Sequence, residues 1–368
     1  MKRLIVVVLI MGLVGCAGCG EAEVPAEPST MQTTEGTTKE QPTTEETTTT
    51  KYYPPPVPPE TVNADYSFTS SYAKTPTYFF AVKTGFQGEE WYSKLYRTPL
   101  RDISKKREIV LPNQYEGHTL RGHAICGITE KELFVSRSYS DTDAEYPPHF
   151  TYVTYRITLE KLDVAVVDAG SYYCDPWYNA ATASLLFVPG NTSFIRLETL
   201  RLEDNKREVL FEDTNNKTES YAAGWHATKD GMAIFENVPW GASGPGSDYI
   251  VIDSTNRAVP MAYDEIDFSW PEAQSKIAAG DKFCVLNVDS QNEDSDGNYI
   301  GYQAQFLLLD ENGNTVRKLA DGREGEDDSF FLALLDGTGM IMMLHESFWN
   351  VGSGFKALYD PATGAVFS

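Results

Sequence analysis

A repeated spacing between an acidic residue and a valine constrains the fold of this chain more than any other feature. Each acid stands six positions before a valine, follows a strand-like apolar run and precedes a segment rich in Asp, Asn, Gly and Thr. Such segments close tight hairpins, because Gly and Asn accept a positive φ and Asp bonds the local backbone. The five acids are Glu160, Glu203, Asp253, Asp310 and Asp360. The pattern predicts one hairpin unit copied along the chain.

The distance between copies predicts the architecture. The acids are 43, 50, 57 and 50 residues apart, and a looser copy precedes them at 66–111. Six units of short strands, at a period of roughly 40 to 50 residues, are typical of a β-propeller. We therefore expect an all-β fold, a six-bladed β-propeller of four-stranded antiparallel blades; an ordinary β-sandwich is the alternative. The units are expected to begin near Tyr66, His123, Trp177, Trp225, Lys276 and Phe330.

Two short motifs resemble known propellers. Residues 224–235 resemble the inner-strand motif of TolB-like six-bladed propellers, in which a Trp-containing strand leads through an Asp-Gly turn to a short apolar strand. The Tyr-Arg pairs at 96–97 and 155–156 resemble propeller lipoproteins of Firmicutes, which share no single activity. The resemblance covers roughly residues 66–368 and implies the fold but no function.

The N-terminus resembles a bacterial lipoprotein signal. A basic start is followed by an apolar run at 4–13, too short to span a bilayer, and then by Leu13-Val14-Gly15-Cys16. This resembles the lipobox, in which the peptide is cut before a Cys that carries a diacylglyceryl thioether. The resemblance implies that residues 1–15 are a signal peptide and that Cys16 anchors the protein to the membrane; a plain secretory signal with a chance Cys is the alternative.

The same resemblance gives a location outside the cytoplasm. The protein would be lipid-anchored to the cell membrane, or to the outer membrane of a Gram-negative host, because Ala17 and not Asp follows the Cys. Residues 16–60 are rich in Thr, Glu and Pro and predict a disordered linker, with the propeller domain at 61–368.

Charge and cysteine content exclude several kinds of partner. The chain has a formal net charge of −23, and −19 remains for the domain once the two cations of the signal and the eight Glu and two Lys of the linker are set aside. No basic cluster stands out, so we expect no nucleic-acid partner. Cys126, Cys174 and Cys284 lie in or beside apolar runs and are predicted to be buried free thiols, with a disulfide as the alternative. We expect a monomer.

The long loops predict an aromatic binding face. In antiparallel blades the loops between second and third strands share a face with the links between blades, and the long connections of this chain belong to that set. Exposed aromatic residues beside Gly and Asp favour glycan or peptide recognition. The candidates are Tyr146, His149, Tyr173, Tyr178, Trp240, Phe348 and Trp349. For Trp177 and Trp225, packing between blades is the favoured interpretation.

No stretch of the sequence carries a catalytic motif, so no catalytic residue and no cofactor are predicted. Residues 292–298 resemble the start of a calcium loop, with Asp294, Asp296 and Asn298 as weak candidate ligands. The twelfth position of that loop would be Gln303 and not Glu, so an acidic hairpin tip is favoured.

These features predict a cell-surface lipoprotein whose propeller is a non-catalytic protein- or glycan-binding module. The alternative is a propeller-fold glycosidase or lyase that uses paired carboxylates at the central channel. A structural envelope component is a third possibility. Paired buried carboxylates in a central pocket would favour the enzyme, whereas an aromatic surface would favour the binding module.

Overall fold

The computed structural model describes residues 54–368 except for 61–62, 64, 88–89, 141–149, 191–193, 215–219, 240–247, 270, 294–298, 323–327 and 348–349. Residues 52–368 form one compact unit. The described residues are almost entirely β-structure, with two single-turn helices, η1 (Ile103–Lys105) and η2 (Tyr263–Glu265). No helix among them has the length and apolar character needed to cross a membrane.

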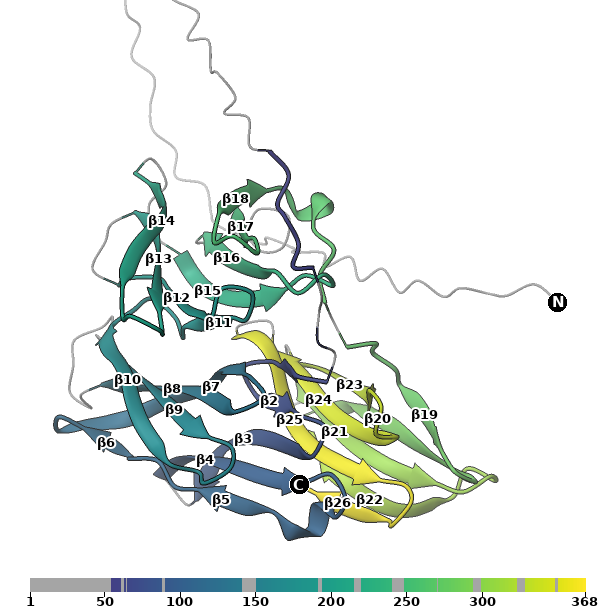
Figure 1. Ribbon diagram of the computed structural model, residues 1–368. Helices are drawn as coiled ribbons and strands as arrows, with labels where there is room; N and C mark the ends of the chain where they lie inside the picture. Colours follow the sequence, from purple (N-terminus) through teal and green to yellow (C-terminus); the bar gives the residue numbers. More distant parts are fainter. Residues whose placement is uncertain are drawn as a thin grey trace, which may run out of the picture. The chain divides into compact units, whose positions relative to one another are not determined.

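The first three sheets use the strands in chain order (Figure 1). Blade one contains β1 (Ser67–Phe68), β2 (Tyr72–Lys74), β3 (Tyr78–Gln87), β4 (Glu90–Pro99) and β5 (Arg107–Ile109). Blade two contains β6 (Gln114–Tyr115), β7 (His118–Ile128), β8 (Glu132–Ser140), β9 (Thr151–Thr158) and β10 (Val164–Ser171). Blade three contains β11 (Trp177–Asn179), β12 (Ser184–Phe187), β13 (Ile195–Arg201) and β14 (Arg207–Asp213).

The last three sheets have four strands each in the described residues. Blade four contains β15 (Ser220–Ala227), β16 (Ala233–Pro239), β17 (Asp248–Ile252) and β18 (Ala258–Met261). Blade five contains β19 (Lys276–Ala279), β20 (Lys282–Glu293), β21 (Tyr299–Leu309) and β22 (Thr315–Asp321). Blade six contains β23 (Asp328–Leu335), β24 (Met340–Ser347), β25 (Asn350–Asp360) and β26 (Ala365–Phe367).

The fold is a six-bladed β-propeller, as the repeat predicted. Each described sheet is antiparallel throughout, and its strands follow one another by hairpins. The predicted starts at Trp177, Trp225, Lys276 and Phe330 fall on the first strands of blades three to six. Blades one and two each carry an additional two-residue strand, β1 beside β2 and β6 beside β7, which the repeat did not indicate.

The core lies between neighbouring blades, and the period of two along each strand assigns side chains to it. On β3, Phe79 and Ala81 pack against blade six, whereas Phe80 and Val82 pack against blade two. Shared clusters of buried side chains also join blades two and three, three and four, and five and six. On blade four, the opposite face packs against the segment containing Ile266 and Phe268. The central strands β3, β8, β12, β16 and β24 are thus covered on both faces, whereas β20 of blade five has a buried cluster on one face only among the described residues.

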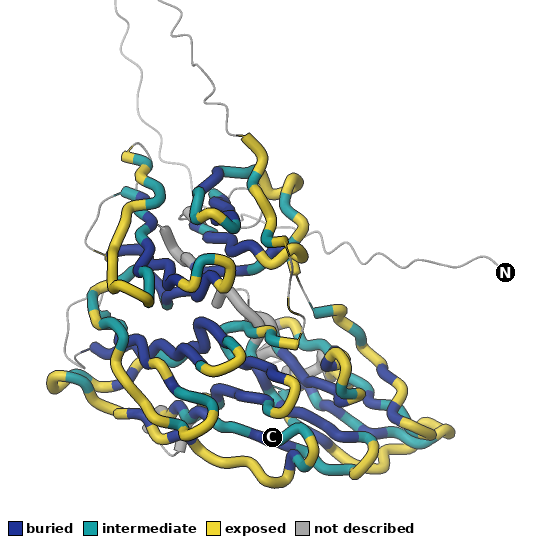
Figure 2. Tube along the Cα trace, viewed as in Figure 1, coloured by how far each residue is buried: buried dark blue, intermediate teal, exposed yellow. Residues whose placement is uncertain are grey.

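Burial falls toward the outer strand of each blade (Figure 2). Three of the five valines of the repeat show this, because Val166, Val209 and Val316 lie on outermost strands and are exposed, whereas Val259 of β18 is buried and Val366 of β26 is half-buried. A β-branched side chain favours the extended backbone even where it is not buried. The three exposed valines therefore contribute to strand formation more than to the core.

The acids of the repeat are turn residues. Asp310 Oδ1 accepts from Asn312 N and Asn314 N at 2.9 and 2.8 Å, and Gly313 adopts a φ of 83°. Asp360 Oδ1 accepts from Ala362 N at 3.0 Å in the equivalent turn of blade six. At Asp253, Asp310 and Asp360 the spacing therefore corresponds to a hairpin closed by its own carboxylate.

The proline-rich segment before the domain contacts the turn of blade four. Val57 N donates to Asp253 Oδ2 at 3.1 Å, Ser254 N donates to Val57 O at 3.0 Å, and Arg257 donates to Pro55 O. Composition places residues 55–57 in the linker, but they belong to the compact unit. The chain is therefore attached to blade four before it enters blade one.

Candidate functional site: a central pocket

The hairpin of β1 and β2 lies where several blades meet. Its Ser70 O accepts from Ile125 N of blade two at 2.7 Å, and its Phe68 ring lies 4.4 Å from the Trp177 ring of blade three. Lys74 Nζ donates to the backbone carbonyl of Asp336 in blade six. Because one short hairpin contacts three other blades, it occupies the middle of the propeller.

A cavity of about 460 Å³ lies beside this hairpin. Its walls come from the hairpin, the first strands of blades three and four, the link between blades four and five, and the turn after β23. The residues used below are Phe68, Lys74, Trp177, Trp225, His226, Glu272, Gln274 and Asp336. We call this cavity the central pocket.

The lining of the central pocket comes from residues near both ends of the first strands. Lys74 and Ala227 are the last residues of β2 and β15, and Asp336 directly follows β23. In antiparallel blades the loops between second and third strands emerge at the opposite end. Trp177 is the first residue of β11, and Pro271 and Gln274 belong to the link before β19, so the pocket is also lined by links between blades, in which the sequence placed part of the binding face.

Two tryptophans give the pocket an aromatic wall. Trp177 and Trp225 are each 8% exposed and belong to the cluster shared by blades three and four, so the predicted packing between blades is confirmed. The Trp225 N–H has no hydrogen-bond partner in the described residues beyond a weak contact with the Cys174 thiol. The ring edges that remain at the pocket can contact an apolar ligand face.

Lys74 brings a buried ammonium to the pocket. The residue is 6% exposed, and its printed contact is the Asp336 carbonyl. Within the described part of the chain, no carboxylate forms an ion pair with it. Lysine is seldom buried without a counter-charge, because its ammonium loses hydration.

His226 is held by a carboxylate at the edge of the pocket. Its Nε2 lies 2.8 Å from Glu236 Oε2, and Glu236 Oε1 accepts from the Tyr249 hydroxyl at 2.8 Å. Both Glu236 oxygens are therefore engaged, and this carboxylate orients His226. The other carboxylates at the pocket, Glu272 and Asp336, are exposed. The described lining thus contains no pair of buried carboxylates.

A second cavity of about 220 Å³ lies between blades one and two, beside the fully buried Arg137. Arg137 Nη1 donates to Leu111 O, Pro112 O and Asn113 Oδ1 at 3.1, 2.8 and 3.1 Å. Its Nη2 donates to Ser93 O at 3.1 Å. Burial lowers the pKa of this guanidinium. Because neighbouring carbonyls engage both terminal nitrogens, Arg137 ties the two blades together.

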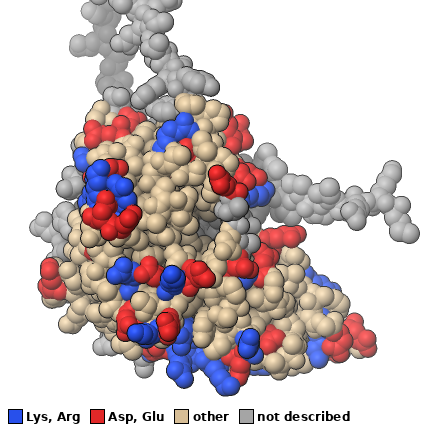
Figure 3. Space-filling model, viewed as in Figure 1, with Lys and Arg blue, Asp and Glu red and all other residues tan. Residues whose placement is uncertain are grey.

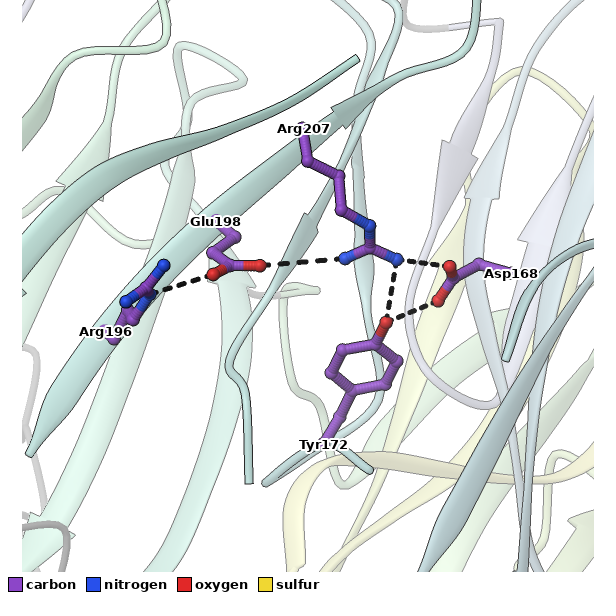
Figure 4. Close-up of polar contacts among 5 residues, drawn as sticks. All are labelled: Asp168, Tyr172, Arg196, Glu198 and Arg207. Atoms are coloured by element: carbon purple, nitrogen blue, oxygen red, sulfur yellow. Dashed lines mark hydrogen bonds and ion pairs between the residues drawn. The ribbon is translucent and has the colours of Figure 1, made fainter. Parts of the chain in front are cut away.

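A polar cluster joins blades two and three near their outer strands (Figure 4). Arg207 forms an ion pair with Asp168, and its Nη2 donates to the Tyr172 hydroxyl at 2.9 Å. That hydroxyl donates to Asp168 Oδ2, and burial, with help from Asp168, raises the Tyr172 pKa. Glu198 lies 3.7 Å from Arg207 Nη1 and 2.8 Å from Arg196 Nε. Every charge in the cluster has an opposite partner, so the cluster stabilises the contact between blades two and three.

The remaining titratable groups form no obvious site. In the part of the chain that the structure describes, no three His, Cys, Asp or Glu residues could together hold a metal ion. The three domain cysteines are free and buried, as predicted. On the face drawn in Figure 3, acidic and basic side chains are interspersed.

Two of the predicted aromatic candidates can be located. Tyr178 is 7% exposed and stacks on Phe134 at 4.7 Å between blades two and three, so its predicted place on an exposed face is wrong. Tyr173 is half-buried against the cluster of blades three and four, and its N–H donates to Val188 O at 2.7 Å. The candidates outside the described residues are Cys16, Tyr146, His149, Trp240, Asp294, Asp296, Asn298, Phe348 and Trp349.

Comparison with known proteins concerns the fold alone. No protein-family model matches the chain, and no curated protein matches it. The propeller domain of the trilobed protease from Pyrococcus furiosus is similar, with a TM-score of 0.36, 11% identity, and coverage of 82% of this chain and 97% of that one. A putative TolB from Agrobacterium tumefaciens is similar with a TM-score of 0.31 and 11% identity, over 70% of this chain and 84% of that one. An oligogalacturonate lyase in complex with manganese is similar with a TM-score of 0.36 and 13% identity, over 77% of this chain and 73% of that one.

Proposed function

We propose that the chain is a lipid-anchored cell-surface protein whose propeller binds a glycan in the central pocket without catalysing its cleavage. The observation that carries this proposal is the composition of the pocket. A cavity of about 460 Å³ combines two tryptophans with Lys74 and Gln274 and has no pair of buried carboxylates in its described lining.

The size and shape of the pocket favour a glycan over a protein. Small-molecule sites commonly enclose about 300–1,000 Å³, whereas protein partners use broad, flatter surfaces. The apolar face of a sugar ring packs on the edge or face of an aromatic side chain. Its hydroxyls can exchange hydrogen bonds with Lys74, Gln274 and the serines of the β1–β2 hairpin.

The arrangement of acids favours binding over hydrolysis. A glycosidase needs two carboxyl groups on either side of the scissile bond, one of them with its pKa raised by its surroundings. Glu272 and Asp336 are both exposed, and Glu236 is engaged by His226 and Tyr249. A lyase remains the second candidate, because the oriented His226 is a suitable general base at the pocket edge.

The membrane anchor is proposed from the lipobox resemblance. Residues 55–57 on blade four would then form the point at which the tether joins the domain. Mass spectrometry of the N-terminal peptide tests this: we expect a diacylglyceryl group on Cys16 and its loss with Cys16→Ser. An unmodified Cys16 in membrane-derived protein would refute the anchor.

A glycan array probed with the full chain, purified in detergent, tests the binding proposal. Glycans that bind are titrated against Gln274→Ala, which truncates a pocket side chain but keeps its backbone pairing with Leu332. The matched control is Gln305→Ala, a half-buried glutamine of β21 outside the pocket. We expect Gln274→Ala alone to weaken binding; equal effects of the two variants would contradict the pocket as the site. Mass spectrometry of the incubated glycans shows whether any is cleaved, which would favour the lyase.

A further inference from the structure

We infer that the glycan in the central pocket carries a carboxylate that pairs with Lys74, so that the ligand class is an acidic glycan containing uronic or sialic acid. This inference rests on the proposed function. It goes further by naming the charged group that the pocket recognises.

The first step is the environment of the Lys74 ammonium. An ammonium has three N–H donors, and the Asp336 carbonyl accepts from one of them. The turn that carries this carbonyl lies beside the ammonium, since a Cβ at Gly337 would be 4.0 Å from Lys74 Nζ. The remaining donors belong to a side chain that lines the central pocket. A ligand oxygen there would complete the hydrogen bonding of Nζ.

The second step is charge. A backbone carbonyl supplies a dipole but no counter-charge, so the buried ammonium stays uncompensated by any described carboxylate. A ligand carboxylate would supply both the acceptor and the opposite charge, and charge-assisted hydrogen bonds are stronger than neutral ones. A neutral sugar hydroxyl would supply the acceptor alone. The pocket should therefore prefer the acid over its uncharged analogue.

The third step is the competition from Glu272 and Asp336, which also line the pocket. Both are exposed to water, whereas Lys74 is 6% exposed. Water and salt screen exposed charges, but they screen a buried charge much less. Contact with Lys74 therefore decides the affinity, while the exposed acids and the negative domain act at longer range. Added salt should weaken this binding little, because it also screens that longer-range repulsion.

The experiment compares each acid with its own methyl ester. Oligosaccharides ending in glucuronic, galacturonic or sialic acid, and the corresponding methyl esters, are titrated calorimetrically into the full wild-type chain. We expect one acid to bind at least tenfold more tightly than its ester. The three sugars distinguish a uronic from a sialic acid as the source of the carboxylate.

The variant Lys74→Met then removes the ammonium and keeps a chain of similar length. We expect the affinity of this variant for the acid to fall to its affinity for the ester, and the affinity for the ester to change little. The matched control is Lys83→Met on β3, a half-buried lysine outside the pocket, which should keep the preference. Thermal denaturation of both variants verifies that they fold, and the comparison of acid with ester in the wild type needs no variant.

The outcomes separate the inference from the proposed function. If acid and ester bind equally well, the glycan site stands and the role of Lys74 as an acid receptor is refuted. If Lys74→Met keeps the preference for the acid, the assignment to Lys74 is wrong. If neither acids, esters nor neutral glycans bind, the proposed function falls and the inference falls with it.

Discussion

The turn of blade four should be far more sensitive to loss of its carboxylate than the same turn of blade five. Asp253 is fully buried, and its Oδ1 accepts from Thr255 N, Thr255 Oγ1 and Arg257 N at 2.9, 2.7 and 3.1 Å. Its Oδ2 accepts from Val57 N and Arg257 Nε, both at 3.1 Å. This one carboxylate therefore closes the hairpin and holds the segment before the domain.

Asp253→Asn keeps the shape and one oxygen but replaces the other oxygen with an amide nitrogen. If Oδ1 keeps its turn contacts, the new NH₂ group faces the donors of Val57 and Arg257. A hydrogen bond to a charged group contributes about 1.5–3 kcal/mol, and Arg257 is partly exposed, so we expect a loss of about 3 kcal/mol in the free energy of unfolding. At about 2.1 cal/mol/K per residue, this corresponds to a melting temperature about 5 °C lower.

The repeat itself supplies the control. Asp310 occupies the equivalent position of blade five and accepts from Asn312 N and Asn314 N, but this turn is exposed, and its carboxylate bonds no second segment among the described residues. Asp310→Asn should lower the melting temperature much less. Limited proteolysis should also cut near Val57 faster in Asp253→Asn than in Asp310→Asn. Equal shifts in the two variants would refute the reasoning.

The dependence on pH follows from the direction of the Asp253 pKa. Burial alone would raise this pKa, but the hydrogen bonds from Thr255, Val57 and Arg257 outweigh it, and the pKa is lowered. A lowered folded-state pKa gives stability that is present above the unfolded value of about 3.9 and is lost as the pH falls through the folded value. The difference between wild type and Asp253→Asn should therefore shrink below about pH 4.

Three further predictions concern other parts of the propeller. Arg137→Met removes the donor shared by Leu111 O, Pro112 O and Ser93 O, so urea denaturation should show a loss of about 3 kcal/mol; unchanged stability would contradict its role. Tyr172→Phe should cost about 1 kcal/mol by the same assay. Because the Tyr172 pKa is raised, the wild type alone should lose this stability as the pH rises above about 10, and a loss at neutral pH would be unexpected. Burial raises the pKa of Cys284 to about 12 and also raises those of Cys126 and Cys174, so thiol reagents should label none of these three at neutral pH before urea unfolds the chain. Peptide mapping that finds any of these three labelled rapidly in the native protein would contradict this.

The fold was predictable because its signal is local. Asp310 accepts from the N–H groups of Asn312 and Asn314, which lie within four positions of it. The residues that determine such a turn are therefore close together in the sequence. Five copies of such a turn and one looser unit leave few architectures open. Tyr178 was misplaced for the opposite reason: β11 is buried along its whole length, so alternation gives no sign of which face is covered.

The central pocket was not predictable, since its contacts join residues far apart in the sequence. Lys74 is one lysine in a short strand, and its partner Asp336 lies 262 positions away. No motif marks either residue. The preference for loops as binding sites also pointed to Trp240 and Trp349, which are outside the described residues.

The position of the β1–β2 hairpin determines which residues can test the pocket. Phe68 packs against the cluster of blades one and two and also against that of blades three and four, and Trp177 and Trp225 belong to the latter. Truncating any of these three would remove core packing that holds blades together, so a loss of binding would say little about ligand contact. Lys74 and Gln274 reach the same cavity without belonging to those clusters. Substitutions at these two positions are therefore the ones whose effects on affinity can be separated from effects on folding.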